Sequence, residues 1–262
     1  MRAGAWVARS GSSRLVKGGS TAPRWCCRLA GGRPGSRLHA LCLRSAGLLE
    51  DPQGLGHALT QIRIIDATAR LIRAPETLFD AAEIGLEAFG WNFANARLLQ
   101  RFHATAATLD TLTTHTTGAL SLRRLDNGWS VTLSDGTTRT APLVVGADGK
   151  KSLVRAAAGL HATEHQFSQS ALVCDLELER PIGGTSIEFH YPQGPFTLVP
   201  AGGNRANLVW IDNAQVLAAA QAGGTDRLLA LLAEKSQRLF GRITPATPSF
   251  VFPLSSLTVS SA

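Results

Sequence analysis

The chain has 262 residues, of which 44% are hydrophobic, enough to bury a sizeable core in one large domain or in two smaller ones. An isoelectric point near 9.9 would suit a nucleic-acid-binding protein, but the charge is unevenly distributed. Residues 1–50 carry nine basic residues and one acidic residue, a net charge of +8, whereas the remainder carries 17 basic and 18 acidic residues. The body is therefore not basic, no nucleic-acid-binding motif accompanies the head, and we expect no nucleic-acid partner.

The first fifty residues form an Arg-rich head to which we assign no domain. Residues 1–49 contain no acidic residue and show no sustained period. Three interpretations are open: a mitochondrial transit peptide, a disordered basic tail, or a mistranslated start of the chain. The four cysteines include no C-x-x-C pair, which indicates neither a zinc site nor a disulfide framework and favours a reducing compartment.

Ordinary globular sequence begins near Leu55. The alternation in Gln61–Asp66 predicts a strand whose partner lies near Ala69–Arg73, and Asn95–Ala106 has the apolar spacing of a helix. The dipeptide Asp135-Gly136 lies between two alternating segments and predicts a hairpin turn. The strands predicted in this part of the chain are Leu120–Leu125, Ser130–Leu133 and Thr138–Val145.

The stretch from Ala141 to Gly159, APLVVGADGKKSLVRAAAG, predicts a buried strand, a tight turn and a helix. The apolar run Leu143–Val145 is typical of the middle of a parallel sheet. Ser152 is the predicted N-cap of a helix that ends at Gly159.

Within that stretch, Gly146 and Gly149 bracket the turn, where a side chain would block the close approach of backbone or ligand. Asp148 lies just beyond the carboxyl end of the predicted strand, which is where open α/β sheets bind their ligands. A carboxylate there can accept hydrogen bonds from ribose hydroxyls or from the first amides of the helix. A phosphate-binding P-loop is excluded, because Lys150 is followed by Lys151 rather than by Ser or Thr.

The segment His161–His165 has the H-x-x-E-H spacing of a class of zinc peptidases. It follows the helix-ending Gly159 in a short connection, so we expect a solvated loop and no metal site. Beyond it, Gly223-Gly224 interrupts a predicted helical region, Ala214–Phe240, and residues 245–262 begin another strand. The antiparallel strands predicted between these features are Ala171–Leu178, Thr185–His190, Phe196–Pro200 and Ala206–Ile211.

GADG followed by KKSLVR resembles the second nucleotide-contacting motif of the flavin-dependent aromatic hydroxylases, which have the para-hydroxybenzoate hydroxylase fold. Within that group the chain is most similar to the ubiquinone-biosynthesis ring hydroxylases. GPFTLVPAGGNRANLVW (Gly194–Trp210) and FPL (Phe252–Leu254) support the resemblance. It covers roughly residues 55–262 and does not extend to the first fifty.

The resemblance implies an α/β fold in which an incomplete, Rossmann-like FAD-binding domain is interleaved with an antiparallel-sheet α+β substrate domain. Residues 55–92 and 165–262 are then parts of the substrate domain, and residues 93–164 are part of the FAD-binding domain. The implied function is FAD-dependent monooxygenation of an aromatic ring in ubiquinone biosynthesis, with NAD(P)H as electron donor and O₂ as the source of oxygen. The implied substrate is a small aromatic molecule or quinone precursor.

No apolar run is long enough to span a membrane. We therefore expect a cytoplasmic protein or one held peripherally at the inner membrane, in mitochondria if the head is a transit peptide. Association with a membrane surface or with a biosynthetic complex follows from the resemblance as a further expectation.

The resemblance also implies site residues. Asp148, Gly146 and Gly149 would contact the cofactor and Arg155 would brace their turn, while Arg97, or Asn95 beside it, would contact the flavin from the start of its helix. For this last pair, ordinary solvated helix residues are an equally good interpretation. No catalytic residue is named, because such enzymes often lack an essential acid or base.

The segment Gly194-Pro195-Phe196 would lie on the substrate side of the flavin. A simple turn between two strands explains the same three residues equally well.

Two motifs of the family are not found. Its members begin with G-x-G-x-x-G, but Gly18-Gly19 and Gly31-Gly32 follow no strand, so among the three interpretations of the head we favour a mistranslated start. A later Gly-Asp motif is also missing. The alternative to an active monooxygenase is thus a truncated, non-enzymatic chain, and we expect the isolated 262-residue chain to be colourless and inactive. A dehydrogenase or halogenase on the same fold is a second alternative.

Overall fold

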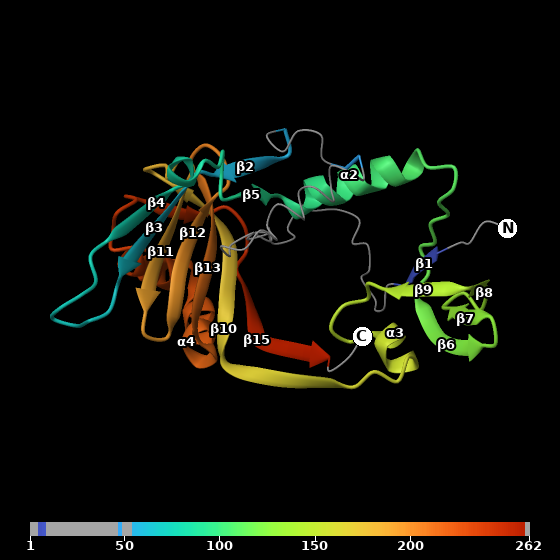
Figure 1. Ribbon diagram of the computed structural model, residues 1–262. Helices are drawn as coiled ribbons and strands as arrows, with labels where there is room; N and C mark the ends of the chain where they lie inside the picture. Colours follow the sequence, from blue (N-terminus) through green and yellow to red (C-terminus); the bar gives the residue numbers. More distant parts are fainter. Residues whose placement is uncertain (1–4, 9–46, 49–53, 260–262) are drawn as a thin grey trace. The chain divides into compact units, whose positions relative to one another are not determined.

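The computed structural model describes residues 5–8, 47–48 and 54–259, which form two compact units (Figure 1). The small unit contains residues 5–8, 110–166 and 255–259, and the large unit contains residues 47–48, 54–109 and 167–254.

An eight-stranded sheet forms the large unit, in the order β14-β10-β13-β12-β11-β3-β4, with β15 also paired to β10. The pairs β10–β13, β13–β12 and β12–β11 are antiparallel, as predicted, whereas β11 and β3 are parallel. The strands are β3 (Gln61–Asp66), β4 (Thr77–Asp80), β10 (Ala162–Leu178), β11 (Thr185–Tyr191), β12 (Gly194–Pro200), β13 (Arg205–Asn213), β14 (Ile243–Pro245) and β15 (Phe250–Val259).

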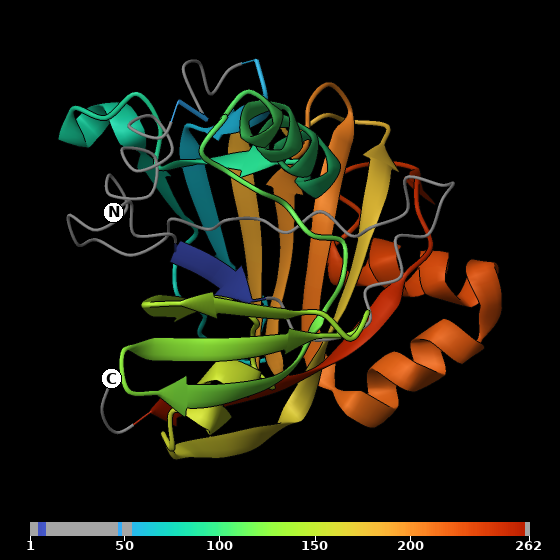
Figure 2. The same cartoon turned by 90° about the vertical axis from the view of Figure 1, so that its right-hand side faces the viewer.

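The core of the large unit lies between this sheet and two helices, α4 (Ala214–Ala222) and α5 (Gly224–Lys235), which lie to one side of it (Figure 2). The predicted break between the helices at Gly223-Gly224 is confirmed. Phe189, Phe196 and Trp210 are fully buried, and Phe189 meets Phe196 edge to face with ring centroids 6.0 Å apart. Burial of each such side chain stabilises the fold by roughly 2–3 kcal/mol.

The large unit also contains an antiparallel pair, β2 (Gly56–Leu59) with β5 (Gly90–Phe93), a short 3₁₀ helix η1 (Ala81–Ile84), and the helix α2 (Asn95–Ala107). The predicted helix from Asn95 is confirmed, with one more residue at its end.

The predicted partner of β3 at Ala69–Arg73 is wrong. The antiparallel partner is β4, and the intervening residues form a loop. The cause is Asp66, whose carboxylate accepts hydrogen bonds from the backbone N–H groups of Thr68 (3.0 Å) and Ala74 (2.9 Å) and so holds this segment away from the sheet.

The small unit contains a three-stranded meander, β6 (Ala119–Leu125), β7 (Gly128–Leu133) and β8 (Thr138–Ala141), and the helix α3 (Leu153–Ala157). The strand predicted over Thr138–Val145 is divided at Pro142 into β8 and β9 (Leu143–Gly146). Pro142 has no N–H to continue the ladder with β7, and after it β9 joins a different sheet. There β9 pairs in parallel with β1 (Ala5–Ala8).

One expectation about this parallel pair needs correction. β9 was expected to be buried, yet the side chains of Leu143 and Val145 are 57% and 45% exposed. Among the described residues β9 has a single strand neighbour, β1, so its apolar side chains lack the layers that cover a central strand. The head was assigned to no domain, and within it the structure describes the strand β1. The glycine pairs at 18–19 and 31–32 lie outside the described residues.

The expectation for His161–His165 also needs correction, because this segment runs into β10 instead of forming a loop. Four residues of extended chain span about 13 Å, so the two imidazoles are too far apart to share one metal ion.

Candidate functional site

The turn after β9 is fixed by the carboxylate of Asp148. Its Oδ1 accepts a hydrogen bond from the Ser152 hydroxyl at 2.5 Å, and its Oδ2 accepts from the backbone N–H groups of Leu153 (2.6 Å) and Val154 (3.2 Å). Ser152 in turn caps α3, since its hydroxyl oxygen accepts from the N–H of Arg155 at 2.9 Å. The predicted N-cap is therefore confirmed, and Asp148 supports it from the preceding turn.

These contacts keep Asp148 ionised. Partial burial on its own would raise the pKa of this carboxyl group, but the hydrogen bonds from the Ser152 hydroxyl and from the amides of α3 outweigh burial, and the pKa is lowered. A negative charge at the start of a helix is also favourable for the helix dipole.

The two glycines that bracket Asp148 serve different purposes. A Cβ on Gly146 would lie 2.8 Å from Cβ of Val154 and 3.3 Å from Oδ1 of Asp148, so this glycine lets α3 approach the end of β9. Gly149 has open space around it but a φ of +79°, a conformation that side chains disfavour. Both residues are therefore required by the shape of the turn.

Two basic side chains hold the outside of the turn. The guanidinium of Arg155 donates to the backbone carbonyl of Lys150 at 2.8 Å, a contact that joins α3 to the turn. The ammonium of Lys150 pairs with Glu164 at 2.5 Å and contacts the hydroxyl of Ser255. The turn is thus tied to its own helix and to β10.

This geometry decides how Asp148 can act. Three hydrogen bonds to its carboxylate come from Ser152 and α3, so the side chain shapes the turn instead of projecting as an isolated ligand. The helix has only five residues, too few to bind an anion by its own N-terminus. A cofactor contact by Asp148, Gly146 or Gly149 stays a prediction.

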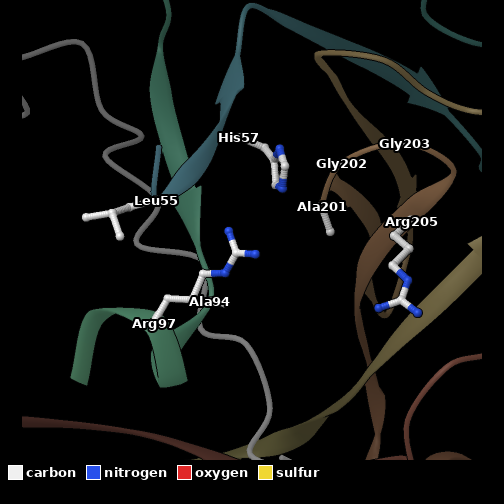
Figure 3. Close-up of a pocket in the computed structure, with 8 residues that line it drawn as sticks. All are labelled: Leu55, His57, Ala94, Arg97, Ala201, Gly202, Gly203 and Arg205. Carbon is white, nitrogen blue, oxygen red and sulfur yellow. The ribbon is translucent and has the colours of Figure 1, made fainter. Parts of the chain in front are cut away.

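The large unit contains a pocket of about 240 Å³ that includes one of the predicted residues, Arg97. Figure 3 shows Arg97 extending from the start of α2 toward His57 on β2, with Arg205 on the opposite side. The residues that line the pocket are Leu55, His57, Ala94, Arg97, Ala201, Gly202, Gly203 and Arg205.

The two arginines that line this pocket differ in whether they have an ion-pair partner. Arg205 pairs with Glu177 at 3.1 Å, whereas the guanidinium of Arg97 has no ion-pair or hydrogen-bond partner within the described part of the chain. The ring of His57 packs against Gly202, where a Cβ would lie 2.3 Å from Cε1 of the ring. An exposed guanidinium beside an imidazole suits an anionic group.

A buried polar network positions the pocket. The amide of Asn92 on β5 donates to the carbonyl of Pro200 at 2.6 Å and to Oδ1 of Asn207 at 2.5 Å, and the amide of Asn207 donates to Asp175 at 2.5 Å. These bonds tie the β2–β5 pair, which carries His57, to the β12–β13 hairpin, which carries the pocket glycines. The sequence analysis did not single out His57, Gly202 or Gly203 as site residues, because no local pattern brings β2 close to the β12–β13 hairpin.

The structure separates the three residues expected on the substrate side. Gly194 (φ +151°) and Pro195 begin β12, while the ring of Phe196 is fully buried in the core against Phe189 and Trp210. Any contact of this segment with a substrate would therefore be made by Gly194 and Pro195. Asn95 lies at the first position of α2 and does not line the pocket.

Within residues 54–259, no group of three His, Cys, Asp or Glu side chains is placed to hold a metal ion. Cys174 is buried, and burial, with the nearby Asp175 charge, raises the pKa of its thiol to about 12. This thiol is therefore unreactive. Cys26, Cys27 and Cys42 lie outside the described residues.

Comparison with known proteins identifies similar sequences, although no family model matches the chain. It is 38% identical over 134 residues to ubiquinone hydroxylase UbiL of Rhodospirillum rubrum, covering 51% of this chain and 31% of that protein. It is 31% identical over 178 residues to 3-demethoxyubiquinol 3-hydroxylase of Escherichia coli, covering 68% of this chain and 45% of that protein. It is 37% identical over 94 residues to the mitochondrial ubiquinone biosynthesis monooxygenase COQ6 of Mus musculus, covering 36% of this chain and 20% of that protein.

The predicted resemblance to ubiquinone-biosynthesis hydroxylases is confirmed by these identities, and the matched part of the chain spans less than half the length of each relative.

Solved structures support the fold. The p-nitrophenol 4-monooxygenase PnpA of Pseudomonas putida matches with a TM-score of 0.67 at 14% identity, covering 98% of this chain and 62% of that one. A flavoprotein/dehydrogenase of Cytophaga hutchinsonii matches with a TM-score of 0.65 at 13% identity, with coverages of 98% and 62%. The predicted α/β fold is thus confirmed.

Proposed function

We propose that this protein hydroxylates an aromatic ring of a ubiquinone precursor, with FAD as cofactor and NAD(P)H as electron donor. The observation that carries the proposal is the 31% identity over 178 residues to 3-demethoxyubiquinol 3-hydroxylase. Halogenation on the same fold is less well supported, since the flavin-dependent brominase Bmp2 is similar at 12% identity only. When bound, FAD supplies the redox chemistry, and the protein must bind, orient and shield the reactants.

In this proposal Asp148 is a positioning residue. Its carboxylate holds Ser152 and the first amides of α3 in place, so the backbone of residues 146–149 keeps the shape in which a cofactor can approach it. Gly146 and Gly149 contribute by the absence of a side chain, and Arg155 secures the turn through the Lys150 carbonyl. Asp148 would therefore control cofactor binding through the shape of the turn, although its hydrogen bonds are made to Ser152 and α3.

Arg97 is the residue that we propose to bind an anionic part of the cofactor directly. Its guanidinium lies in a pocket with His57 and has no described partner of its own. A guanidinium can form two parallel hydrogen bonds to a phosphate group, which favours this assignment over a contact with a neutral ring.

The test is a chimera in which residues 55–262 of this chain replace the corresponding segment of the Escherichia coli relative. It is expressed in a strain that lacks 3-demethoxyubiquinol 3-hydroxylase, and ubiquinone is measured by mass spectrometry. We expect ubiquinone to be restored, and to be lost again with Asp148→Ala or Arg97→Ala. Asp135→Ala is the matched control, because Asp135 makes an equivalent Asp-Gly turn in the adjacent hairpin.

A folded chimera that contains flavin but leaves ubiquinone absent would contradict the proposed activity. The intact 262-residue chain is purified in parallel, and its visible absorbance shows whether it retains flavin by itself.

A further inference from the structure

The loop between β3 and β4, residues 67–76 (the β3–β4 loop), presents apolar side chains to solvent. Leu71 is 100% exposed and Ile72 is 87% exposed. Figure 1 shows this loop extending beyond the ends of the neighbouring strands of the large unit. Single exposed leucines are common, but two adjacent large apolar side chains with almost no contacts at the end of a projecting loop indicate a surface that is covered by something else.

The base of the loop is held firmly. Asp66 accepts hydrogen bonds from the N–H groups of Thr68 and Ala74 and so bridges almost the whole loop, and the N–H of Ala67 donates to the His190 carbonyl at 3.1 Å. Arg63 pairs with Glu76 at 2.5 Å across the strand ends. The exposed pair is therefore presented by an ordered base, which lowers the entropy cost of binding through it.

The residues that flank the pair are basic. Arg70 and Arg73 flank Leu71 and Ile72 directly, both are exposed, and no acidic residue lies between positions 67 and 75. The nearest acids lie at the base of the loop. Asp66 accepts hydrogen bonds from Thr68 and Ala74 and interacts with the charge of Arg70, and Glu76 pairs with Arg63. The edge strand β4 adds two half-exposed apolar side chains, Leu78 and Phe79.

We propose that the β3–β4 loop docks the protein onto an anionic membrane surface, with Leu71 and Ile72 inserted among the lipid chains and Arg70 and Arg73 at the phosphate groups. A bilayer suits this surface better than a protein does. A stable protein interface buries about 800 Å² on each side, far more than four side chains offer, whereas a bilayer accepts a small apolar insertion flanked by basic residues. The inference does not depend on the proposed activity. Among the described residues no helix is long and apolar enough to cross a membrane.

Vesicle sedimentation of the intact chain tests the proposal, with vesicles of phosphatidylcholine and phosphatidylglycerol in equal parts. Because the head carries a net charge of +8, it will attract these vesicles at low salt whatever the loop does. Binding is therefore also measured at about 0.5 M NaCl, where the Debye length is roughly 4 Å. The test variant is Leu71→Ser with Ile72→Ser, and the control is Ile84→Ser, which removes a 66% exposed side chain from η1.

At high salt we expect the double variant to bind about tenfold more weakly than wild type and the control to bind within about twofold of it. At low salt, Arg70→Gln with Arg73→Gln should weaken binding to anionic vesicles by roughly fivefold per arginine and leave binding to pure phosphatidylcholine unchanged. Circular dichroism and size-exclusion chromatography confirm that the variants fold, as expected at side chains without packing contacts.

Three results would overturn the proposal: no wild-type binding at high salt, equal binding by wild type and the Leu71/Ile72 variant, or an equal loss in the Ile84 control. In each case the β3–β4 loop does not insert into lipid.

Discussion

The small unit contains two Asp-Gly turns that look alike in sequence and differ in structure. Asp135-Gly136 joins β7 to β8, and Asp148-Gly149 joins β9 to α3. Both glycines have positive φ, +81° and +79°, and the pKa of each aspartate is lowered by hydrogen bonds. The dipeptide and its backbone conformation therefore do not distinguish a simple hairpin from a candidate cofactor site.

The distinction lies in what each carboxylate holds. Asp135 accepts only from the N–H and hydroxyl of Thr137, at 2.9 and 2.7 Å, so its contacts stay inside the turn. Asp148 reaches Ser152, Leu153 and Val154 and fixes the start of a helix against the end of a parallel strand. Four experiments on the small unit test this difference, beginning with the largest expected effect.

Gly146→Ala tests the close approach of α3 to β9. Its Cβ would lie 2.8 Å from Cβ of Val154, so we expect a loss of about 1–3 kcal/mol in the local free energy of unfolding. The rate of hydrogen exchange of the α3 amides measures this loss of local stability. The matched control is Gly118→Ala, since nothing lies within 4 Å of that site and its φ is not positive. Equal exchange rates in both variants would show that α3 does not need this approach.

Asp148→Ala removes the support of the N-cap. We expect a loss of about 1–2 kcal/mol, read from faster exchange of the Leu153 and Val154 amides. Asp135→Ala should leave those amides unchanged and affect only the hairpin, because Asp135 makes no contact with α3. Similar exchange at Leu153 in both variants would remove the distinction between the two turns.

Gly149→Ala and Gly136→Ala test whether the glycines of the two turns have the same role. Neither added Cβ meets an atom within 4 Å, and the two residues have nearly the same φ. We therefore expect equal losses of about 1 kcal/mol, from backbone strain alone. Thermal unfolding of the two variants measures these losses of stability. A markedly larger loss at Gly149 would contradict the prediction, because it would require packing contacts that are absent around that residue.

The smallest expected effect concerns pH. The pKa of Asp148 is lowered below its usual value of 3.8 in the folded protein. Its contribution to stability is therefore complete above that value and is lost as the pH falls through the lowered pKa. The difference in Tm between wild type and Asp148→Asn should shrink as the pH is taken below about 4. A difference that stays constant down to pH 2 would mean that ionisation of Asp148 does not matter.

Local patterns predicted most of the elements because the interactions that form them are local. The N-cap at Ser152, the hairpin at Asp135 and the helix break at Gly223 each depend on residues within a few positions of one another. Hydrophobic alternation likewise located the antiparallel strands, since one face of each packs on the core.

Long-range contacts could not be predicted in this way. The pocket at Arg97 joins residues more than a hundred positions apart, and it is positioned by bonds between Asn92, Pro200 and Asn207 that no local pattern contains. The exposure of Leu143 was missed for a similar reason, because an apolar run shows that a strand is suited to burial but not how many neighbours cover it.

The central claim is that the Asp148 turn, and not the Asp135 turn, governs cofactor binding. The direct measurement is the dissociation constant for FAD, by fluorescence titration, of the chimera that carries residues 55–262 and of its Asp148→Ala and Asp135→Ala variants. We expect Asp148→Ala to weaken FAD binding by about tenfold or more, equivalent to roughly 1.4 kcal/mol, and Asp135→Ala to change it by less than about twofold. Equal changes in the two variants would contradict the account.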